Sequence, residues 1–201
     1  MELPAPGGGT LFVALHEDVY RPSDDTFLLA QAVHAEVAGR PGRFLEVGCG
    51  AGFVSLVAAR AGCTVTCTDA NPQAVALAAH NAKQNGLRVT AVEGDLLAGQ
   101  PGPFDVVAFN PPYLPTADDE RLPGPLNLAF DGGQDGNATV LRFVDQVGRL
   151  AKRPGTVLVI HSTLSDPAPL RAAMARLGYR NDVAAQSKLD YERLTVQRFR
   201  A

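Results

Sequence analysis

Apolar positions along this chain recur in two patterns, short continuous runs and longer segments with helical spacing. We interpret five of the short runs as buried strands: RFLEV, TVTCTDA, RVTAVEGD, FDVVAFNPP and GTVLVIHS. Near the C-terminus, two further runs alternate with polar residues, one around Val183 and one in RLTVQRF. These two runs predict a pair of short strands at the end of the chain.

Segments with helical spacing lie before, between and after these strands, and their ends carry helix signals. The first begins after Ser23, where two acidic residues follow in the first turn. Another opens with Asn71 as cap and Pro72 at the first helical position. The predicted helices are SDDTFLLAQAVHAEVAG, FVSLVAARAG, NPQAVALAAHNAKQNG, ATVLRFVDQVGRLAK and DPAPLRAAMARLG.

The alternation of strands and helices predicts an α/β fold with a parallel sheet and right-handed crossovers. Residues 1–18 are expected to form an N-terminal tail, and residues 19–201 a single domain. Sheets of this kind bind ligands at the carboxyl ends of their strands. The residues expected at that edge are Glu46–Gly52, Asp69, Asp95 and Asn110.

Charge and composition narrow the function classes. The formal net charge of −3 offers no strong basic field for a nucleic-acid backbone, which counts against a duplex-binding protein without excluding it. No apolar run approaches membrane-spanning length, and the start MELPAPGGGT lacks the features of a signal peptide. Because the three cysteines suit a reducing compartment, we expect a cytoplasmic protein.

The cysteines and histidines do not predict a metal site. Cys63 and Cys67 lie four positions apart in CTVTCTD, which is a poor spacing for zinc ligands. On a strand they share one face, so we interpret them as small buried apolar groups. The four histidines are scattered along the chain.

The glycine-rich segment EVGCGAG distinguishes between two cofactors. The dinucleotide fingerprint would need a third glycine at position 53, where the chain has Phe53. Glu46 would repel a pyrophosphate but would favour a cationic ligand. A glycine loop with Gly48 and Gly50 behind an acidic residue therefore favours S-adenosylmethionine, which carries an ammonium and a sulfonium but no phosphate, over NAD.

Two aspartates extend this cofactor hypothesis along the next strands. Asp69, at the end of TVTCTD, has two acceptor oxygens that suit the two hydroxyls of a ribose. Asp95, in EGDLL, is placed to accept from an adenine amino group. Either residue alone could be a turn or cap residue. Their order on successive strands after the glycine loop favours the joint interpretation.

The stretch FNPPY ends a buried strand with an asparagine, two prolines and a tyrosine. Proline cannot donate to a sheet, so the strand stops at Pro111 and Pro112. Fixed there, the Asn110 side-chain carbonyl and the Pro111 backbone carbonyl would form two acceptors for a planar –NH2 group, with the Tyr113 ring stacked on it. An ordinary proline turn is the alternative interpretation.

Around these motifs the chain resembles the HemK-type methyltransferases, in particular the short forms found in eukaryotes and archaea. The similarity is carried by VYRPSDDTFLL, EVGCGAG, TDANPQA, FNPPYLPT and AFDGGQDG. It implies a class I, Rossmann-like sheet of seven strands with an antiparallel last hairpin. It also implies that Asn110–Tyr113 hold a glutamine amide. The implied cofactor contacts are Thr26, Glu46, Gly48, Asp69, Asp95 and Asn110. From composition alone, Ser23, Asp24 and Asp25 are expected to be a plain helix cap and Thr26 an ordinary helical residue.

The resemblance also implies partners. Enzymes of this type methylate the glutamine of the GGQ motif in class I release factors, and short forms often work with a small zinc-binding activator subunit. The loop from Leu114 to Gly136 is long enough to be functional, and Asp118, Asp119 and Glu120 would make its entrance acidic. The GGQ letters at Gly132–Gln134 are interpreted as coincidence. The open alternatives are a methyltransferase for exocyclic amines of nucleic acids and a cofactor-binding scaffold without catalysis.

Overall fold

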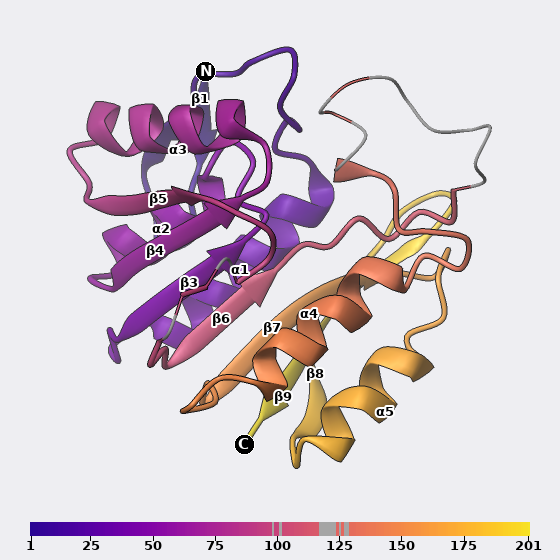
Figure 1. Ribbon diagram of the computed structural model, residues 1–201. Coiled ribbons are helices and arrows are strands. Elements are labelled where there is room, and N and C mark those ends of the chain that lie inside the picture. Colours follow the sequence, from indigo (N-terminus) through magenta and orange to yellow (C-terminus); the bar gives the residue numbers. More distant parts are fainter. Residues whose placement is uncertain (98, 101, 117–123, 125, 127–128) are drawn as a thin grey trace.

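The protein is built around one seven-stranded sheet with helices on both faces (Figure 1). The computed structural model describes residues 1–97, 99–100, 102–116, 124, 126 and 129–201. The strands run in the order β5-β4-β3-β6-β7-β9-β8, and β9 is antiparallel to both of its neighbours. Their bounds are β3 (Arg43–Val47), β4 (Thr64–Asp69), β5 (Val89–Glu93), β6 (Val106–Phe109), β7 (Thr156–Ser162), β8 (Arg180–Lys188) and β9 (Arg193–Arg200). This confirms the expected class I topology.

The two faces of the sheet carry two separate cores. Leu158 and Ile160 of β7 pack on the same face as α1 and α2, whereas Val157 and Val159 pack on the face of α4 and α5. This alternation is the two-residue period of a strand that is buried on both sides. The helices are α1 (Asp24–Val37), α2 (Phe53–Arg60), α3 (Pro72–Gln84), α4 (Ala138–Gly148) and α5 (Ala168–Arg176).

The C-terminal strands differ from the sequence prediction. They are nine and eight residues long rather than short, and most of β9 is buried instead of alternating. The reason is that β9 lies inside the sheet, between β7 and the edge strand β8, so that both of its faces are covered. Its polar residues Thr195 and Gln197 are therefore buried as well, and they form side-chain hydrogen bonds. Helix α4 also ends at Gly148, earlier than predicted.

The segment expected to be a tail contains a hairpin that packs onto the domain. Strands β1 (Glu2–Pro4) and β2 (Thr10–Phe12) pair with each other, and Leu3 and Leu11 are buried in the core with α1 and α2. Residues 1–18 are therefore not a free extension, although the division of the chain at residue 18 stays a prediction. Within the part of the chain that the structure describes, no helix has the length and apolarity needed to cross a membrane.

Candidate active site

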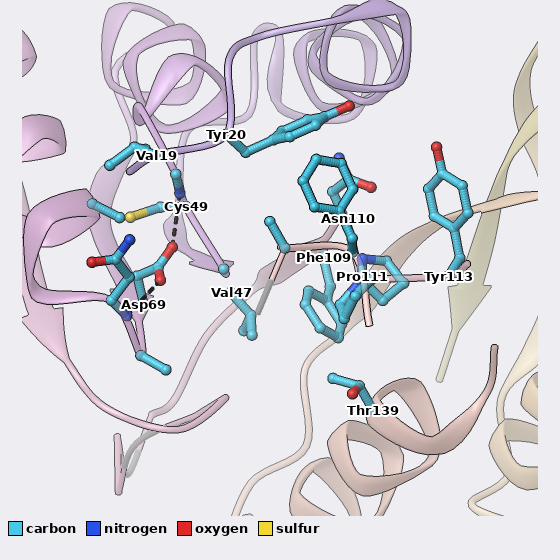
Figure 2. A pocket seen from close by; sticks show the side chains of 18 of the residues that line it. Val19, Tyr20, Val47, Cys49, Asp69, Phe109, Asn110, Pro111, Tyr113 and Thr139 are labelled. Atoms are coloured by element: carbon cyan, nitrogen blue, oxygen red, sulfur yellow. Dashed lines mark hydrogen bonds between the residues drawn. The ribbon is translucent and has the colours of Figure 1, made fainter. Parts of the chain in front are cut away.

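A cavity of about 530 Å³ opens at the carboxyl ends of β3, β4 and β6. Figure 2 shows Cys49 and Asp69 at one end and Asn110, Pro111 and Tyr113 at the other. We call these the glycine-loop end and the NPPY end. Every residue predicted for the site lines this cavity: Thr26, Glu46, Gly48, Gly50, Asp69, Asp95, Asn110, Pro111, Pro112 and Tyr113. The structure thus brings the set together, while the role of each residue stays a prediction.

The glycine loop after β3 depends on left-handed backbone conformations. Gly48 and Gly52 have φ angles of +64° and +80°, which disfavour residues with a side chain. A Cβ at Gly48 would lie 3.3 Å from the Phe109 ring, and one at Gly52 would lie 2.9 Å from the Ala78 Cβ. Gly52 therefore allows the loop to pack closely against α3. A glycine is not needed at the next position, where Phe53 begins α2 and packs in the core.

Asp69 is held as a fixed pair of acceptors at the end of β4. Its Oδ2 accepts from the Gly50 N–H at 2.9 Å, and its Oδ1 accepts from the Asn71 N–H at 2.9 Å (Figure 2). Burial raises the pKa of this carboxyl, and the backbone donors oppose that shift. Each oxygen keeps a lone pair, so the carboxylate still suits two ribose hydroxyls.

The carboxyl of Glu46 is buried and hydrogen-bonded. Its side chain is 4% exposed, and Oε2 accepts from both the backbone N–H, at 2.8 Å, and the hydroxyl of Ser55. Burial raises the pKa of Glu46 to about 8, and the charge of Asp69 adds to the rise. A neighbouring cation would favour the ionised form, so this carboxyl fits a positively charged ligand.

Asp95 lies at the surface of the cavity and has a cationic partner. Its carboxylate forms an ion pair with Arg142 of α4, and both side chains are more than half exposed. An exposed pair of this kind is weak, so it leaves the carboxylate available to a ligand donor.

The prediction that Asp25 belongs to a plain helix cap is wrong, because its side chain is buried and lines the cavity. Ser23 occupies the cap position of α1 without a side-chain capping bond. Asp25 is 4% exposed, and its Oδ1 accepts from the Thr26 N–H at 2.6 Å and from the Thr26 hydroxyl at 3.1 Å. The second residue of the helix is thereby turned inward, toward the cavity that it lines.

The second carboxylate oxygen of Asp25, Oδ2, accepts hydrogen bonds from three side chains at the NPPY end. It accepts from Asn110 Nδ2 at 3.0 Å, from the Tyr20 hydroxyl at 3.1 Å and from the Tyr113 hydroxyl at 3.4 Å. Burial, together with the charge of Asp25, raises the pKa of both tyrosines, so both hydroxyls keep their protons and act as donors. Sequence reasoning missed Asp25 and Tyr20, and their only signal was their place in the segment VYRPSDDTFLL.

Asn110 has one amide atom bound and one unused. Because its nitrogen faces the Asp25 carboxylate, its Oδ1 points the other way. Among the described residues, Oδ1 has no hydrogen-bond partner although it is buried. A buried acceptor without a partner is costly in a folded protein, and its presence beside a cavity indicates a ligand donor.

Two further residues missed by sequence reasoning complete the NPPY end. Phe130 packs edge-on against Tyr20 with ring centroids 5.5 Å apart. Glu192, in the turn between β8 and β9, lines the cavity, accepts from the Ser162 hydroxyl and contributes to the raised pKa of Tyr113. The acidic positions predicted at the loop entrance, Asp118, Asp119 and Glu120, lie outside the described residues.

Known methyltransferases are similar in sequence to most of this chain. Residues 21–121 match the family model described as "Methyltransferase small domain". A putative protein N5-glutamine methyltransferase of Methanocaldococcus jannaschii is 37% identical over 183 residues, which is 90% of this chain and 91% of that protein. Methyltransferase HEMK2 of Mus musculus is 32% identical and covers 98% of this chain and 96% of its own length.

The chain belongs to the HemK-type N5-glutamine methyltransferases. A solved structure of the E. cuniculi Mtq2–Trm112 complex superposes with a TM-score of 0.71 at 26% identity, covering 91% of this chain and 98% of that one. The T. thermophilus 16S rRNA methyltransferase RsmC has a TM-score of 0.72 at 18% identity, covering 100% of this chain and 49% of that one, and shares the fold alone.

Membership of the HemK-type family implies use of S-adenosylmethionine, and the residues of the cavity fit that group. The buried carboxyl of Glu46 suits a cation, and the oriented carboxylate of Asp69 suits a diol. The unused Asn110 oxygen lies where β6 ends, between the glycine loop and Tyr113 (Figure 2). The fit supports a cofactor placed across the carboxyl ends of β3, β4 and β6.

Proposed function

We propose that the protein methylates the side-chain amide of the glutamine in the GGQ motif of a class I release factor. The observation that carries the proposal is the buried Oδ1 of Asn110, which has no partner within the described part of the chain and lies in a fixed NPPY turn beside the cavity. Relatives support the choice of substrate. The E. cuniculi complex is described as responsible for methylation of eRF1. A release factor glutamine methyltransferase of Deinococcus radiodurans is 39% identical over 70% of this chain and 52% of that protein.

The glycine-loop end would hold the cofactor. Asp69 would accept from the ribose hydroxyls, Glu46 would stabilise the positive charge, and the backbone of Gly48 and Gly50 would allow close approach. The remaining proposed contacts are those of Thr26, Asp95 and Asn110. When bound there, S-adenosylmethionine supplies an electrophilic methyl group on a sulfonium.

The NPPY end would hold the glutamine amide. Asn110 Oδ1 and the Pro111 carbonyl would accept its two N–H groups, Pro112 would keep the turn rigid, and Tyr113 would pack on the amide plane. Acceptors aimed at the nitrogen stabilise positive charge as it develops during methylation. No strong base is needed, since the amide nitrogen becomes acidic once it carries that charge, and its proton can pass to solvent or to the acceptors.

The acidic groups of the NPPY end favour a peptide over a nucleic acid. Asp25 and Glu192 both line this end, and the net charge of the chain is −3. A phosphate backbone would be repelled here, whereas a protein loop flanked by basic residues would be attracted. A flipped base would in addition cost a few kcal/mol of unstacking.

Methylation of an exocyclic amine in a nucleic acid is the second candidate. A ribosomal RNA small subunit methyltransferase C of Alcanivorax borkumensis is 36% identical over 93 residues, which is 46% of this chain and 29% of that protein. That match spans less than half of the chain, so it supports the shared cofactor-binding part more than the substrate.

We also propose a cytoplasmic location and a partner. Since the E. cuniculi relative was solved as a complex with Trm112, a small zinc-binding activator subunit is the partner expected for this chain. Activity should therefore be measured with the chain alone and with the corresponding subunit added.

The proposed reaction is tested by incubating the enzyme and labelled cofactor with the release factor of its own organism. A copy in which the GGQ glutamine is changed to alanine, total RNA and DNA serve as parallel substrates. We expect label only in the unchanged release factor. Asn110→Ala should lower turnover by about 10²–10³-fold, as for other losses of one aligned polar group. Equal labelling of both release factors, or labelling of nucleic acid alone, would contradict the proposal.

A further inference from the structure

We propose that Asp25 is a positioning residue that fixes the amide orientation of Asn110 and thereby creates the acceptor used on the methylated nitrogen. This inference deepens the proposed function and rests on it for the identity of the substrate amide. Asp25 lies 85 positions before Asn110, and their contact is made only by the folding of α1 onto the end of β6.

An asparagine side chain has nearly the same shape when its nitrogen and oxygen exchange places. Only its hydrogen-bond partners decide which atom points where. A carboxylate oxygen accepts and does not donate, so Asp25 Oδ2, 3.0 Å from Asn110 Nδ2, selects the orientation with the nitrogen toward α1. The carbonyl oxygen is then left buried, without a partner among the described residues.

Asp25 is itself held firmly enough to impose this choice. Both donors of Thr26, its backbone N–H and its hydroxyl, bind Oδ1, which leaves Oδ2 to face the NPPY turn. The helix that carries Asp25 is anchored by buried side chains such as Leu28 and Leu29. Rotation of the carboxylate would break these contacts, so its direction is set by α1.

Asp25 also positions two tyrosines that line the NPPY end. The Tyr20 hydroxyl binds Oδ2 at 3.1 Å, and the Tyr113 hydroxyl binds it at 3.4 Å. Since an oxygen accepts two donors well, the longest of the three contacts is the one that a substrate displaces most easily. Asp25 therefore holds Asn110 and Tyr20 tightly and Tyr113 loosely.

Asp25→Asn removes the carboxylate while keeping the shape of the side chain. The new amide would keep its oxygen on the two Thr26 donors and turn its nitrogen toward Asn110. Asn110 would then rotate to accept from it and would present N–H groups to the substrate amide. We expect a loss of turnover of about 10²–10³-fold, with the cofactor dissociation constant within about threefold of wild type.

Asp24→Asn is the matched control for this variant. Asp24 lies in the same helical turn, but it is exposed and does not line the cavity. The substitution removes the same charge from the same helix N-terminus, so it reproduces any effect on helix stability. We expect turnover close to that of wild type.

A reversal of the pair separates positioning from a structural role. Asn110→Asp alone places two carboxylates in contact, and we expect low activity. Combined with Asp25→Asn, the new amide at position 25 donates to the new carboxylate at position 110, whose second oxygen again faces the substrate. We expect the double variant to be at least about tenfold more active than the better single variant, because contacting residues couple strongly.

A measurement without substrate keeps this inference separable from the proposed function. In wild type, the side-chain NH2 protons of Asn110, assigned by their loss in Asn110→Ala, should exchange with solvent more slowly than those of surface asparagines. The contact with Asp25 predicts that protection whether or not a release factor is methylated. Three outcomes would overturn the role of Asp25. The Asn110 NH2 protons could exchange fast in wild type, or Asp25→Asn could keep full activity. The double variant could also show a loss of activity equal to the product of the two single losses.

Discussion

Asp69 shows how backbone donors prepare a side chain for a ligand. The Gly50 and Asn71 N–H groups each bind one of its oxygens at 2.9 Å, so the carboxylate cannot rotate. One of these donors belongs to the glycine loop, so that Asp69 also joins the loop to β4. A diol bound at Asp69 would meet acceptors that are already oriented.

Asp69→Ala should weaken binding of S-adenosylmethionine by about 1–3 kcal/mol, the range for charged hydrogen bonds. Glu93→Ala is the control, because Glu93 pairs with Asp69 in register on β5 but is exposed and does not line the cavity. Isothermal titration calorimetry would measure both variants. We expect micromolar affinity for S-adenosylmethionine in wild type and no binding of NAD, and the reverse preference would refute the interpretation of the glycine loop.

Helix α3 joins the N-terminal hairpin to the cofactor loop. Asn85 exchanges two hydrogen bonds with the backbone of Phe12, and Asn81 does the same with Ala14. The amide nitrogen of Asn81 also donates to the Ala51 carbonyl in the glycine loop at 2.9 Å. Asn81 in α3 and Asn85 at its C-cap therefore replace a strand as the partner of residues 12–14.

Leu11→Ala should reduce the free energy of unfolding by about 2–5 kcal/mol, the usual cost of emptying a buried leucine site. Phe12→Ala should change it by less than about 1 kcal/mol, because the Phe12 side chain is 44% exposed. Urea denaturation of both variants would test the difference. If residues 1–18 did not contribute to the folded core, neither substitution would change the free energy of unfolding.

At the scale of the whole molecule, the fold concentrates acidic groups in one cavity. Glu46, Asp69, Asp25 and Glu192 come from different elements and all line it. Burial raises the pKa of Glu46 and of Asp69, which means that their burial in the cavity opposes the ionisation of both carboxyls. A cationic ligand would relieve that cost, so the charge state of the site is linked to folding and to binding.

Glu46 should make stability depend on pH. Its pKa rises from 4.5 to about 8 on folding, so the folded state binds the proton more tightly. The stabilising contribution of that proton is complete below about pH 4.5 and is lost as the pH rises through about 8. Glu46→Gln cannot titrate, so its melting temperature should rise relative to wild type between pH 5 and about pH 9.

Thermal melts of both proteins across this pH range would show whether the melting temperature of Glu46→Gln rises relative to wild type. Asp24→Asn would control for the loss of an exposed charge. Added S-adenosylmethionine should favour the ionised carboxylate, so its stabilising effect on wild type should grow with pH more than its effect on Glu46→Gln. A constant difference between the two melting temperatures at all pH values would show that Glu46 does not titrate in this range.

The alternation of strands and helices gave the sheet, the five helices and the edge that carries the site. Gly48, Asp69 and Asn110 could be identified because each lies at the carboxyl end of a predicted strand or directly after it, and the carboxyl ends of parallel strands meet at one edge. The burial of β9 and the packing of β1 and β2 could not be read in this way. Both depend on which surfaces meet in space, and a local pattern does not specify that.

The chemistry of the cofactor loop and of the NPPY turn was therefore present in short stretches of sequence, because backbone geometry and residue type are local properties. The orientation of the Asn110 amide was not. It depends on Asp25 in α1, on Tyr20 before it and on the burial of Oδ1, which no described residue partners. Asp25 and Tyr20 lie far from Asn110 in the chain, and the hydrogen bond between Asp25 and Asn110 exists only because α1 packs against the end of β6. Tertiary structure thus decided which atom of Asn110 is available to a substrate.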